Sequence, residues 1–572
     1  MECKANRLSQ TAKWLQIPSI AVATISTTPL LHSKPAIKHI KLKNVEPLSP
    51  DMPLIGKLPH IGIVGAGIAG LRCADVLLGR GFRVTILEAR DYIGGRVCQS
   101  NVGDIMVDLG PNWIHGTRNN PIVEISELSK TITYALNGSQ GVVDRSGRSM
   151  DTKTTTKLAD FMWTTIDKAF EYSRRNSDRI PATTSLFDYF KTNLETSGFP
   201  SDEQEACLEL SKLWGAYIGS PVDRQSLKFF FLEESNLLVA STHRDILKYI
   251  AKPAMEGADI RLNEPVVAID AQPRKAEMDH HISVTTTSGK QYKFDELVTT
   301  FPLGWLKQNK AVFKPELPPR LSKAIDSISY GQLEKVYVHF PSAFWHVPQS
   351  HESEPSTARG PMGAAERKEG ANIAEPEPTG TPAFTQFMAP NYVDHPDTPF
   401  WNQECLSLAA MPENLSHPTL LFYMYGTCAA EIVSRIAHHP VDSKEYSTIL
   451  NDFLYPYYSR LPHYDPSSPS CKPIAFLATQ WQNDPWAGHG SYSNFQVGLE
   501  EGDRDIITMR EGMGVERGVW FAGEHTAPFV GLGTTSGAYW SGEHAAERIC
   551  EFLEKGSVSS PCRSEVDGRF VV

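Results

Sequence analysis

Apolar residues first form a regular pattern at residues 61–64, where Ile-Gly-Ile-Val makes a short run typical of a buried parallel strand. A second apolar run, at residues 83–87, predicts another strand. Between the two runs, apolar residues recur at the spacing of one helix face, at Ile68, Leu71, Ala74, Leu77 and Leu78. The pattern therefore predicts a strand–helix–strand unit of a parallel sheet.

The turns of this predicted unit carry three glycines and one acid. Gly65, Gly67 and Gly70 follow the first strand as G-x-G-x-x-G, and Glu88 ends the second strand. Gly65 permits a tight turn, Gly67 lacks the Cβ that would block a pyrophosphate, and Gly70 lets the helix pack close to the strand. The helix N-terminus directs N–H groups at the phosphates, and Glu88 can accept hydrogen bonds from a ribose. Together these features predict a dinucleotide-binding site.

An arginine that could bind the pyrophosphate follows this unit. Arg96 comes after a pair of glycines, eight residues beyond Glu88. Its planar guanidinium offers several donors, so it can return to the pyrophosphate.

Beyond residue 116 the pattern changes from strands to helices and back. Residues 117–240 carry little strand signal and show helical spacing at 158–173, 185–196 and 202–217. Strand patterns return at 259–270, 281–287, 295–304, 406–410 and 418–425. Helices are predicted at 428–438 and 443–455, and a strand from Gly518 precedes a last helix that begins at Thr534–Thr535.

Composition narrows the classes of function. The 572 residues are 41% hydrophobic, which is enough for a large core and two or more domains. Lys and Arg number 55 against 66 Asp and Glu, a net charge of −11 that argues against a nucleic-acid binder. The nine cysteines are dispersed without C-x-x-C or zinc spacing, so we expect reduced thiols and no metal site. No apolar run reaches the ~18 residues of a membrane span.

Two stretches lie outside these patterns. Residues 1–57 form a leader that is basic and rich in Ser and Thr over its first part. We expect it to be disordered in a cytoplasmic protein, with mitochondrial targeting as the alternative. Residues 346–380 are rich in Glu, Pro, Gly and Ala, which predicts a disordered surface insertion.

Three motifs, in this order and spacing, resemble the flavin-containing amine oxidases, which include polyamine oxidases, monoamine oxidases and lysine-specific histone demethylases. They are G-x-G-x-x-G at 65–70, E-A-R-D-x-x-G-G-R at 88–96 and D-L-G-x-x-W-I-H-G at 108–116. Further similarity at 301–340, 479–495 and 518–543 extends the resemblance to about residues 58–555.

The resemblance implies an α/β (α+β) fold. A Rossmann-like FAD-binding domain is discontinuous in sequence, and a substrate domain of mixed sheet and helices is inserted into it. The implied division is a leader at 1–57, FAD-binding parts at 58–116, 241–300 and 479–555, substrate-domain parts at 117–240 and 301–478, and a flexible tail at 556–572.

The dinucleotide is then expected to be FAD. No cysteine stands near Ser491, where monoamine oxidases carry the cysteine that tethers the flavin, so the resemblance implies a non-covalent cofactor. It implies that Val267 contacts the adenine through its backbone, and that Glu524 binds ribityl or ribose hydroxyls. Thr534 and Thr535 would begin a helix directed at the flavin N1–C2 edge. The implied cofactor-binding residues are Gly65, Gly67, Gly70, Glu88, Arg90, Arg96, Asn112, Trp113, Val267, Trp486, Glu524, Thr534 and Thr535.

Three residues are implied to act on the substrate or the flavin. From strand alternation alone Lys335 would point to solvent, but the resemblance places it opposite flavin N5, where it holds a water. His115 is implied to hydrogen-bond a substrate nitrogen, with a structural loop histidine as the alternative. Tyr492 would form one wall of an aromatic cage. The opposite wall is aromatic in monoamine oxidases and plant polyamine oxidases but is Thr534 here, which implies a wider site and disfavours small aromatic amines as substrates.

The expected function is that of an FAD-dependent amine oxidase with a polyamine or related secondary amine as substrate and O2 as acceptor. An L-amino-acid oxidase or a flavin desaturase is the alternative enzyme, although no motif supplies the cation that would hold a substrate carboxylate. Histone demethylation is disfavoured because no heptad-containing insertion interrupts the substrate domain. A non-enzymatic carrier of this fold is the third alternative. The oligomeric state is left open.

Overall fold

The computed structural model describes residues 58–136, 140–231, 236–275, 281–346, 373–374, 382–393, 401–412, 414–528 and 531–557. The chain divides into Met1–Glu46 and Pro47–Val572, and the described residues all belong to the second unit. The predicted leader, most of the predicted insertion at 346–380 and the tail beyond 557 lie outside the described residues.

A five-stranded parallel sheet in the order β23-β13-β1-β2-β9 carries the first motif. Its central strand β1 is apolar and buried because the sheet is covered on both faces: Ile61 and Ile63 have no exposed surface. The strands come from segments far apart in sequence, with bounds β1 (His60–Val64), β2 (Arg83–Leu87), β9 (Asp259–Arg261), β13 (Glu296–Thr299) and β23 (Val519–Phe521).

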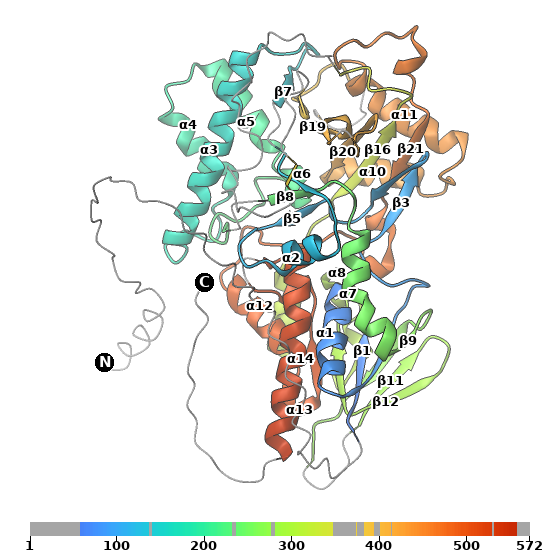
Figure 1. Ribbon diagram of the computed structural model, residues 1–572. Helices are drawn as coiled ribbons and strands as arrows, with labels where there is room; N and C mark the ends of the chain where they lie inside the picture. The colour runs from blue at the N-terminus through green and yellow to red at the C-terminus, as the bar shows by residue number, and fades with distance from the viewer. Residues whose placement is uncertain are drawn as a thin grey trace, which may run out of the picture. The chain divides into compact units, whose positions relative to one another are not determined.

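Helices cover one face of this sheet, where α1 (Ile68–Gly79) lies beside α7 (Arg244–Gly257) and α14 (Thr535–Ser557) (Figure 1). The approach of α14 is close, since a Cβ on Gly542 would lie 2.1 Å from the Ala69 carbonyl oxygen. A small sheet in the order β12-β11-β10-β14 covers the other face. Its strands are β10 (Val266–Asp270), β11 (Ile282–Thr286), β12 (Gln291–Phe294) and β14 (Phe313–Lys314).

A second, six-stranded sheet has the strand order β21-β16-β20-β19-β18-β7. One face, which includes Val336 and Val338, packs against α10 (Gly426–Ile436) and α11 (Lys444–Tyr458). The strands are β7 (Gln140–Val143), β16 (Glu334–His339), β18 (Phe384–Phe387), β19 (Gln403–Ser407), β20 (Thr419–Met424) and β21 (Ala475–Ala478). Parallel and antiparallel sheets in one chain confirm the α/β (α+β) class.

The stretch 117–240 differs from its prediction in two ways. It contains strands β6 (Thr133–Tyr134), β7 and β8 (Asn236–Val239), each formed only by pairing with distant strands, so local spacing gave no signal. The single helix expected at 202–217 is instead α5 (Ser201–Lys212) followed by the short α6 (Gly215–Ile218). The other two helical stretches are α3 (Thr152–Asn176) and α4 (Leu186–Glu195).

Three further boundaries depart from the sequence pattern. The strand expected at 406–410 begins and ends earlier, as β19 (Gln403–Ser407), and Leu408–Ala410 forms a 3-10 turn. Ile373–Ala374, inside the predicted insertion, forms β17 and pairs with β6. The last helix runs to Ser557, slightly beyond the predicted start of the tail.

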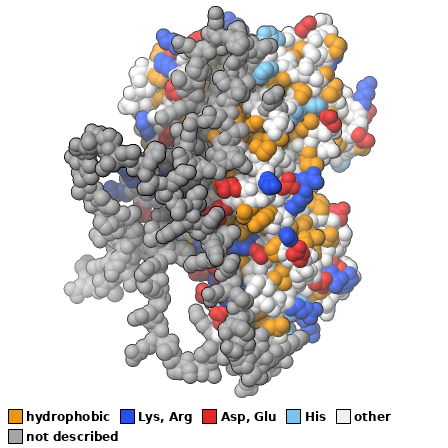
Figure 2. Space-filling model, viewed as in Figure 1, with side chains coloured by type: hydrophobic (Ala, Val, Ile, Leu, Met, Phe, Trp, Pro, Cys, Tyr) orange, Lys and Arg blue, Asp and Glu red, His pale blue; other side chains and the backbone are white. Residues whose placement is uncertain are grey.

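The remaining elements connect these layers. They are β3 (Gln99–Val102), β4 (Ile105–Asp108), β5 (Trp113–His115), α2 (Pro121–Leu128), α8 (Leu303–Gln308), η2 (Lys310–Val312), α9 (Pro319–Ser327), β15 (Ser329–Tyr330), η4 (Pro469–Cys471), η5 (Trp481–Asn483), η6 (Pro485–Ala487), β22 (Ser493–Asn494), α12 (Gly502–Glu511), α13 (Gly514–Arg517) and η7 (Glu524–Thr526). On the face in Figure 2, acidic side chains lie beside basic ones and are interspersed with hydrophobic groups.

Candidate active site

A cavity of about 410 Å³ lies where the carboxyl end of the parallel sheet meets the six-stranded sheet and α3. Residues from all of these elements line it, including most of those predicted from the sequence. The predicted residues in the lining are Gly65, Gly67, Glu88, Arg90, Arg96, Asn112, Trp113, His115, Lys335, Trp486, Tyr492, Glu524, Thr534 and Thr535.

Two predicted cofactor residues are not in the lining. Gly70 lies behind it, where a Cβ would come within 2.0 Å of the Gly65 carbonyl oxygen, so its role is the close packing of helix on strand. Val267 has 49% of its surface exposed, whereas its neighbour Val266 is buried and lines the cavity. The pairing of β10 with β11 is irregular between Val266 and Ala268, and the expected contact of Val267 with the adenine through its backbone stays a prediction.

The glycine-rich turn leaves room for a ligand. Gly65 has φ of +102°, a conformation that favours glycine, and a Cβ added to Gly67 would meet no atom within 4 Å. Gly67 is the N-cap of α1, no side chain caps this helix start, and Ile68 and Ala69 of its first turn line the same space. This open cradle fits a pyrophosphate.

Glu88 is held by backbone donors on both of its carboxylate oxygens. The Ala66 N–H donates to Oε2 at 2.7 Å, and the Arg90 N–H donates to Oε1 at 2.9 Å. Each oxygen has a second lone pair, so Glu88 keeps acceptor capacity for ribose hydroxyls. Arg90 itself pairs with Asp484 at 2.8 Å.

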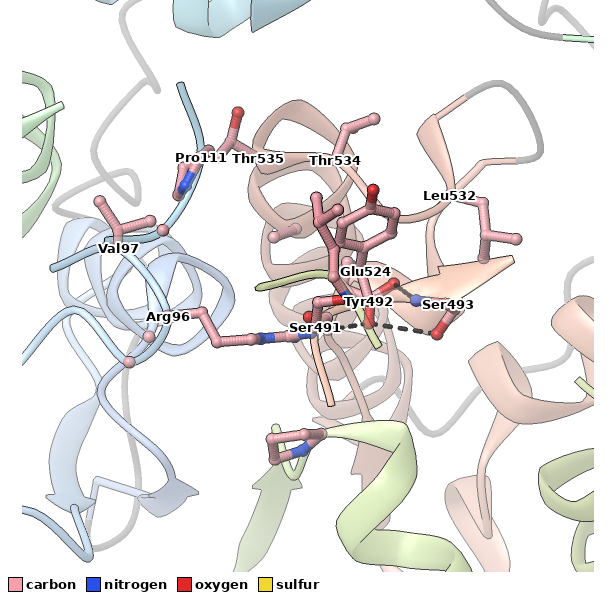
Figure 3. A pocket seen from close by; sticks show the side chains of 18 of the residues that line it. Arg96, Val97, Pro111, Ser491, Tyr492, Ser493, Glu524, Leu532, Thr534 and Thr535 are labelled. Atoms are coloured by element: carbon pink, nitrogen blue, oxygen red, sulfur yellow. Dashed lines mark hydrogen bonds and ion pairs between the residues drawn. The ribbon is translucent and has the colours of Figure 1, made fainter. Parts of the chain in front are cut away.

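Arg96 extends across the cavity to Glu524 (Figure 3). Its Nη1 donates to Glu524 at 3.0 Å, to the Ser491 carbonyl at 2.6 Å and to the Tyr330 hydroxyl at 3.0 Å. Glu524 also accepts from the N–H and hydroxyl of Ser493 at 3.2 and 3.1 Å. Within the described part of the chain these Arg96 contacts all use Nη1, which leaves Nη2 and Nε to donate to a ligand.

The last helix begins at the predicted place, beside the cavity. The Thr534 hydroxyl accepts from the Gly537 N–H at 2.9 Å, as an N-cap residue does, and donates to the Gly531 carbonyl. The Thr535 hydroxyl is buried and has no hydrogen-bond partner among the described residues. An unpartnered hydroxyl at the positive end of a long helix fits a polar, partly anionic edge of a bound group such as a flavin.

Lys335 is buried, in contrast to the expectation from strand alternation alone. β16 is a central strand whose two faces are both covered, so Lys335 is only 5% exposed and points to the cavity. Its ammonium donates to the Gly110 carbonyl. Burial lowers the pKa of Lys335 to about 8, although the negative charge of Asp108 opposes the shift.

Glu334, on the opposite face of β16, supports the loop that carries the tryptophans. It accepts from the Gln482 N–H at 2.8 Å and from the Thr479 hydroxyl. Burial raises the pKa of Glu334 to about 7. Trp481 and Trp486 lie on this loop, which follows β21, and both line the cavity.

The substrate side of the cavity is largely aromatic. The Tyr492 hydroxyl donates to the Tyr217 carbonyl, and the Trp113 indole donates to the Tyr423 hydroxyl at 3.3 Å. Tyr423 in turn donates to Asn112 at 3.2 Å. Sequence reasoning did not identify Tyr217 or Tyr423. The strand pattern at 418–425 could have placed Tyr423 on a buried face, but not at a site.

His115 ends β5 with its side chain exposed, yet it lines the cavity. Its carbonyl accepts from the Asn120 side chain at 2.9 Å, and Asn120 accepts from Ser536 on α14 at 2.8 Å. This chain of bonds ties the histidine loop to the helix that begins at Thr535.

The described residues lack three further features. They contain no group of three or more His, Cys, Asp or Glu side chains placed to hold a metal ion. None of the described helices has both the length and the apolar character that a membrane span requires. No cysteine is among the described residues that line the cavity.

Comparison with known proteins gives one consistent result. A family model described as "Flavin containing amine oxidoreductase" matches residues 68–418 and 465–550. Polyamine oxidase 4 of Oryza sativa subsp. japonica is 28% identical over 305 residues, which are 50% of this chain and 60% of that protein. Lysine-specific histone demethylase 1B of Mus musculus is 30% identical over 309 residues, which are 50% of this chain and 36% of that protein. The chain thus spans 60% or less of the length of these relatives.

Proposed function

We propose a polyamine oxidase activity for this chain, which belongs to the flavin-containing amine oxidoreductase family and has FAD as its non-covalent cofactor. The proposed substrates are polyamines or related secondary amines, and O2 is the final electron acceptor. Bound FAD supplies the two-electron acceptor for a hydride from the carbon next to the amine nitrogen. The substrate, having lost that hydride and a proton, becomes an imine, which water hydrolyses to an aldehyde and an amine. O2 takes up the two electrons and two protons as hydrogen peroxide.

The observation that carries this proposal is the buried Lys335, which faces the same cavity as the N-terminus of α14. A desolvated ammonium held at the Gly110 carbonyl can hold a water, or stabilise negative charge that develops on O2. Thr535 and the helix dipole would stabilise the flavin edge on which negative charge accumulates. Both features place positive charge at the same cavity, which supports a reaction in which negative charge develops there.

The aromatic walls favour a neutral reacting nitrogen. Hydride can leave only from an amine with a free lone pair, and an apolar surrounding disfavours the ammonium form. Tyr492, Trp113 and Tyr423 supply that surrounding. His115 lines the same cavity, and we propose that it hydrogen-bonds a substrate nitrogen.

Polyamines are supported by the charges in the lining and by the relatives. Asp167 on α3 lines the cavity and has an exposed side chain, which suits a cationic chain. Relatives that match about half of this chain carry the name polyamine oxidase. We expect Thr534, where monoamine oxidases and plant polyamine oxidases carry an aromatic residue, to leave a wider site, which disfavours small aromatic amines.

The described lining offers no unpaired arginine to bind a substrate carboxylate, which disfavours an L-amino-acid oxidase. The arginines in the described lining are Arg90 and Arg96, and they pair with Asp484 and Glu524. Both lie among the residues proposed to hold the cofactor. No specific observation favours a desaturase or a carrier without activity.

The proposal is tested by a peroxide assay on the purified yellow protein. Spermine, spermidine, their N-acetyl forms, benzylamine, L-leucine and a dimethyl-lysine histone peptide would be compared at equal concentration. We expect the largest kcat/KM with one of the polyamines. Turnover of the peptide alone would replace the proposal with demethylation, and turnover of L-leucine alone would replace it with amino-acid oxidation.

A further inference from the structure

One row of residues crosses the six-stranded sheet from Lys335 outward. Lys335 on β16 is directly opposite Tyr423 on β20, Tyr423 is opposite Glu404 on β19, and Glu404 is opposite Gln386 on β18. Directly paired residues share one face of a sheet. Strands lie about 4.8 Å apart, so Glu404 lies roughly 10 Å along this row from Lys335.

Glu404 is a buried carboxylate behind the cavity wall. It has no exposed surface, and both of its oxygens lie 2.8 Å from the Tyr217 hydroxyl. Gln386 donates to it at 3.2 Å. No salt bridge within the described residues offsets its charge, which makes the ionised form costly unless a cation approaches.

Tyr217 separates this carboxylate from the cavity. It lines the cavity, whereas Glu404 does not. The single hydroxyl proton is donated to Glu404, so the lone pairs of the same oxygen are left to accept from a ligand. An adjacent carboxylate makes that oxygen a stronger acceptor.

The position of Tyr217 is fixed by its neighbours. Its carbonyl accepts from Tyr492, and its ring lies 6.1 Å from Trp163 and 5.5 Å from Trp214. Trp163 and Trp214 also line the cavity. A cation beside the Tyr217 oxygen would therefore meet aromatic faces as well as an acceptor.

We propose that Tyr217, held by Glu404, recognises a second, positively charged nitrogen of the substrate, at a point two strands along the sheet from Lys335. This inference rests on the proposed amine oxidase function. Tyr217 touches the substrate, and Glu404 is a positioning residue that acts through it. The reacting nitrogen is neutral beside Lys335, while a distal nitrogen keeps its charge, so the pair selects diamines and polyamines over amines with one nitrogen.

The charge of Glu404 gives the recognition a pH dependence. Burial raises its pKa to about 7, and the groups that face it are Tyr217 on α6, Tyr423 on β20 and Gln386 on β18, with Cys405 beside it on β19. Above pH 7 the carboxylate is ionised and attracts the ammonium. Below pH 7 it is protonated, and affinity for a dication should fall.

The test measures binding and turnover in the holoenzyme. Spermidine is compared with dibutylamine, a secondary amine with one nitrogen, by the rate of flavin reduction in the absence of O2 at increasing amine concentration, which gives a dissociation constant for each amine. We expect Glu404→Gln and Tyr217→Phe to weaken spermidine binding about 10- to 100-fold, the worth of a hydrogen bond to a charged group. Binding of dibutylamine should change less than about 3-fold, and kcat should change little.

A matched control comes from the same sheet. Glu334 is equally buried and its pKa is also raised to about 7, but it lies on the opposite face. Glu334→Gln should leave the ratio of spermidine to dibutylamine affinity unchanged. Glu404→Asp, which keeps the charge, should recover part of the loss.

The outcomes separate the two proposals. Equal weakening of both amines by Glu404→Gln, or spermidine affinity in the wild type that is flat between pH 6 and 8.5, would overturn the role of Glu404. A wild-type protein that binds spermidine in a Glu404-dependent way but forms no peroxide would leave that role in place and overturn the oxidase function instead.

Discussion

The two sides of the cavity are built in different ways. On the side where we propose that FAD binds, backbone groups make the cradle, at the turn Gly65–Gly67, the first turn of α1 and the start of α14, and the side chains of Glu88 and Arg96 add to it. The substrate side uses side chains, such as Lys335 and Tyr423, which distant antiparallel strands bring into one row. A backbone site depends on local sequence, whereas a side-chain row depends on register across the whole sheet.

The largest effect is expected on the substrate side, for Lys335→Met. Loss of the buried ammonium should slow reoxidation of the reduced flavin by O2 by about 100-fold or more, the usual range for a lost proton-transfer or charge-stabilising group. Stopped-flow absorbance measures this rate apart from flavin reduction. Lys307 is the control, because burial also lowers its pKa to about 8 but it does not line the cavity. Unchanged reoxidation in Lys335→Met would remove Lys335 from the mechanism.

Two glycine substitutions on the proposed cofactor side should differ in their effect on folding. Gly67 has φ of −77° and open space around its missing Cβ, so Gly67→Val should fold normally but weaken FAD binding by about 10- to 100-fold. Gly70→Ala places a Cβ 2.0 Å from the Gly65 carbonyl, so it should lower the melting temperature of the apoprotein as well. Flavin fluorescence and thermal melts distinguish the two effects. A Gly67→Val protein that retains full FAD affinity would show that no phosphate approaches this turn.

The same contrast explains what the sequence could and could not predict. The strand, turn and helix at 60–79 follow from local spacing, and the start of the last helix at Thr535 was predicted for the same reason. The burial of Lys335 followed only from family resemblance, since alternation alone pointed it to solvent. Glu404 and Tyr217 carry no local signal, because their pairing joins β19 to α6 across a long sequence separation. Short strands such as β8 were missed for that reason as well.

The buried glutamates of the six-stranded sheet predict how stability depends on pH. Burial raises the pKa of Glu334 and Glu404 from 4.5 to about 7, so the folded state binds more protons than the unfolded state between these values. The contribution of these two glutamates to the free energy of unfolding is therefore fully present below pH 4.5 and is lost as the pH rises through 7. Glu404→Gln should show a smaller loss between pH 5.5 and 8.5 than the wild type, measured by denaturant unfolding. An identical loss in both proteins would mean that Glu404 does not titrate in this range.

The smallest effects are expected from the two threonines at the start of α14, whose hydroxyls test how much side chains add to the proposed cofactor site. The Thr535 hydroxyl is buried without a partner in the described residues, so Thr535→Val should leave the apoprotein as stable as the wild type or slightly more stable. If that hydroxyl meets the flavin, FAD affinity should fall about 3- to 10-fold. Thr534→Val removes the cap on Gly537 and should instead cost about 1 kcal/mol of unfolding free energy. Equal FAD affinity in Thr535→Val and the wild type would leave the helix N–H groups and dipole as the only contribution of this helix start to the cofactor.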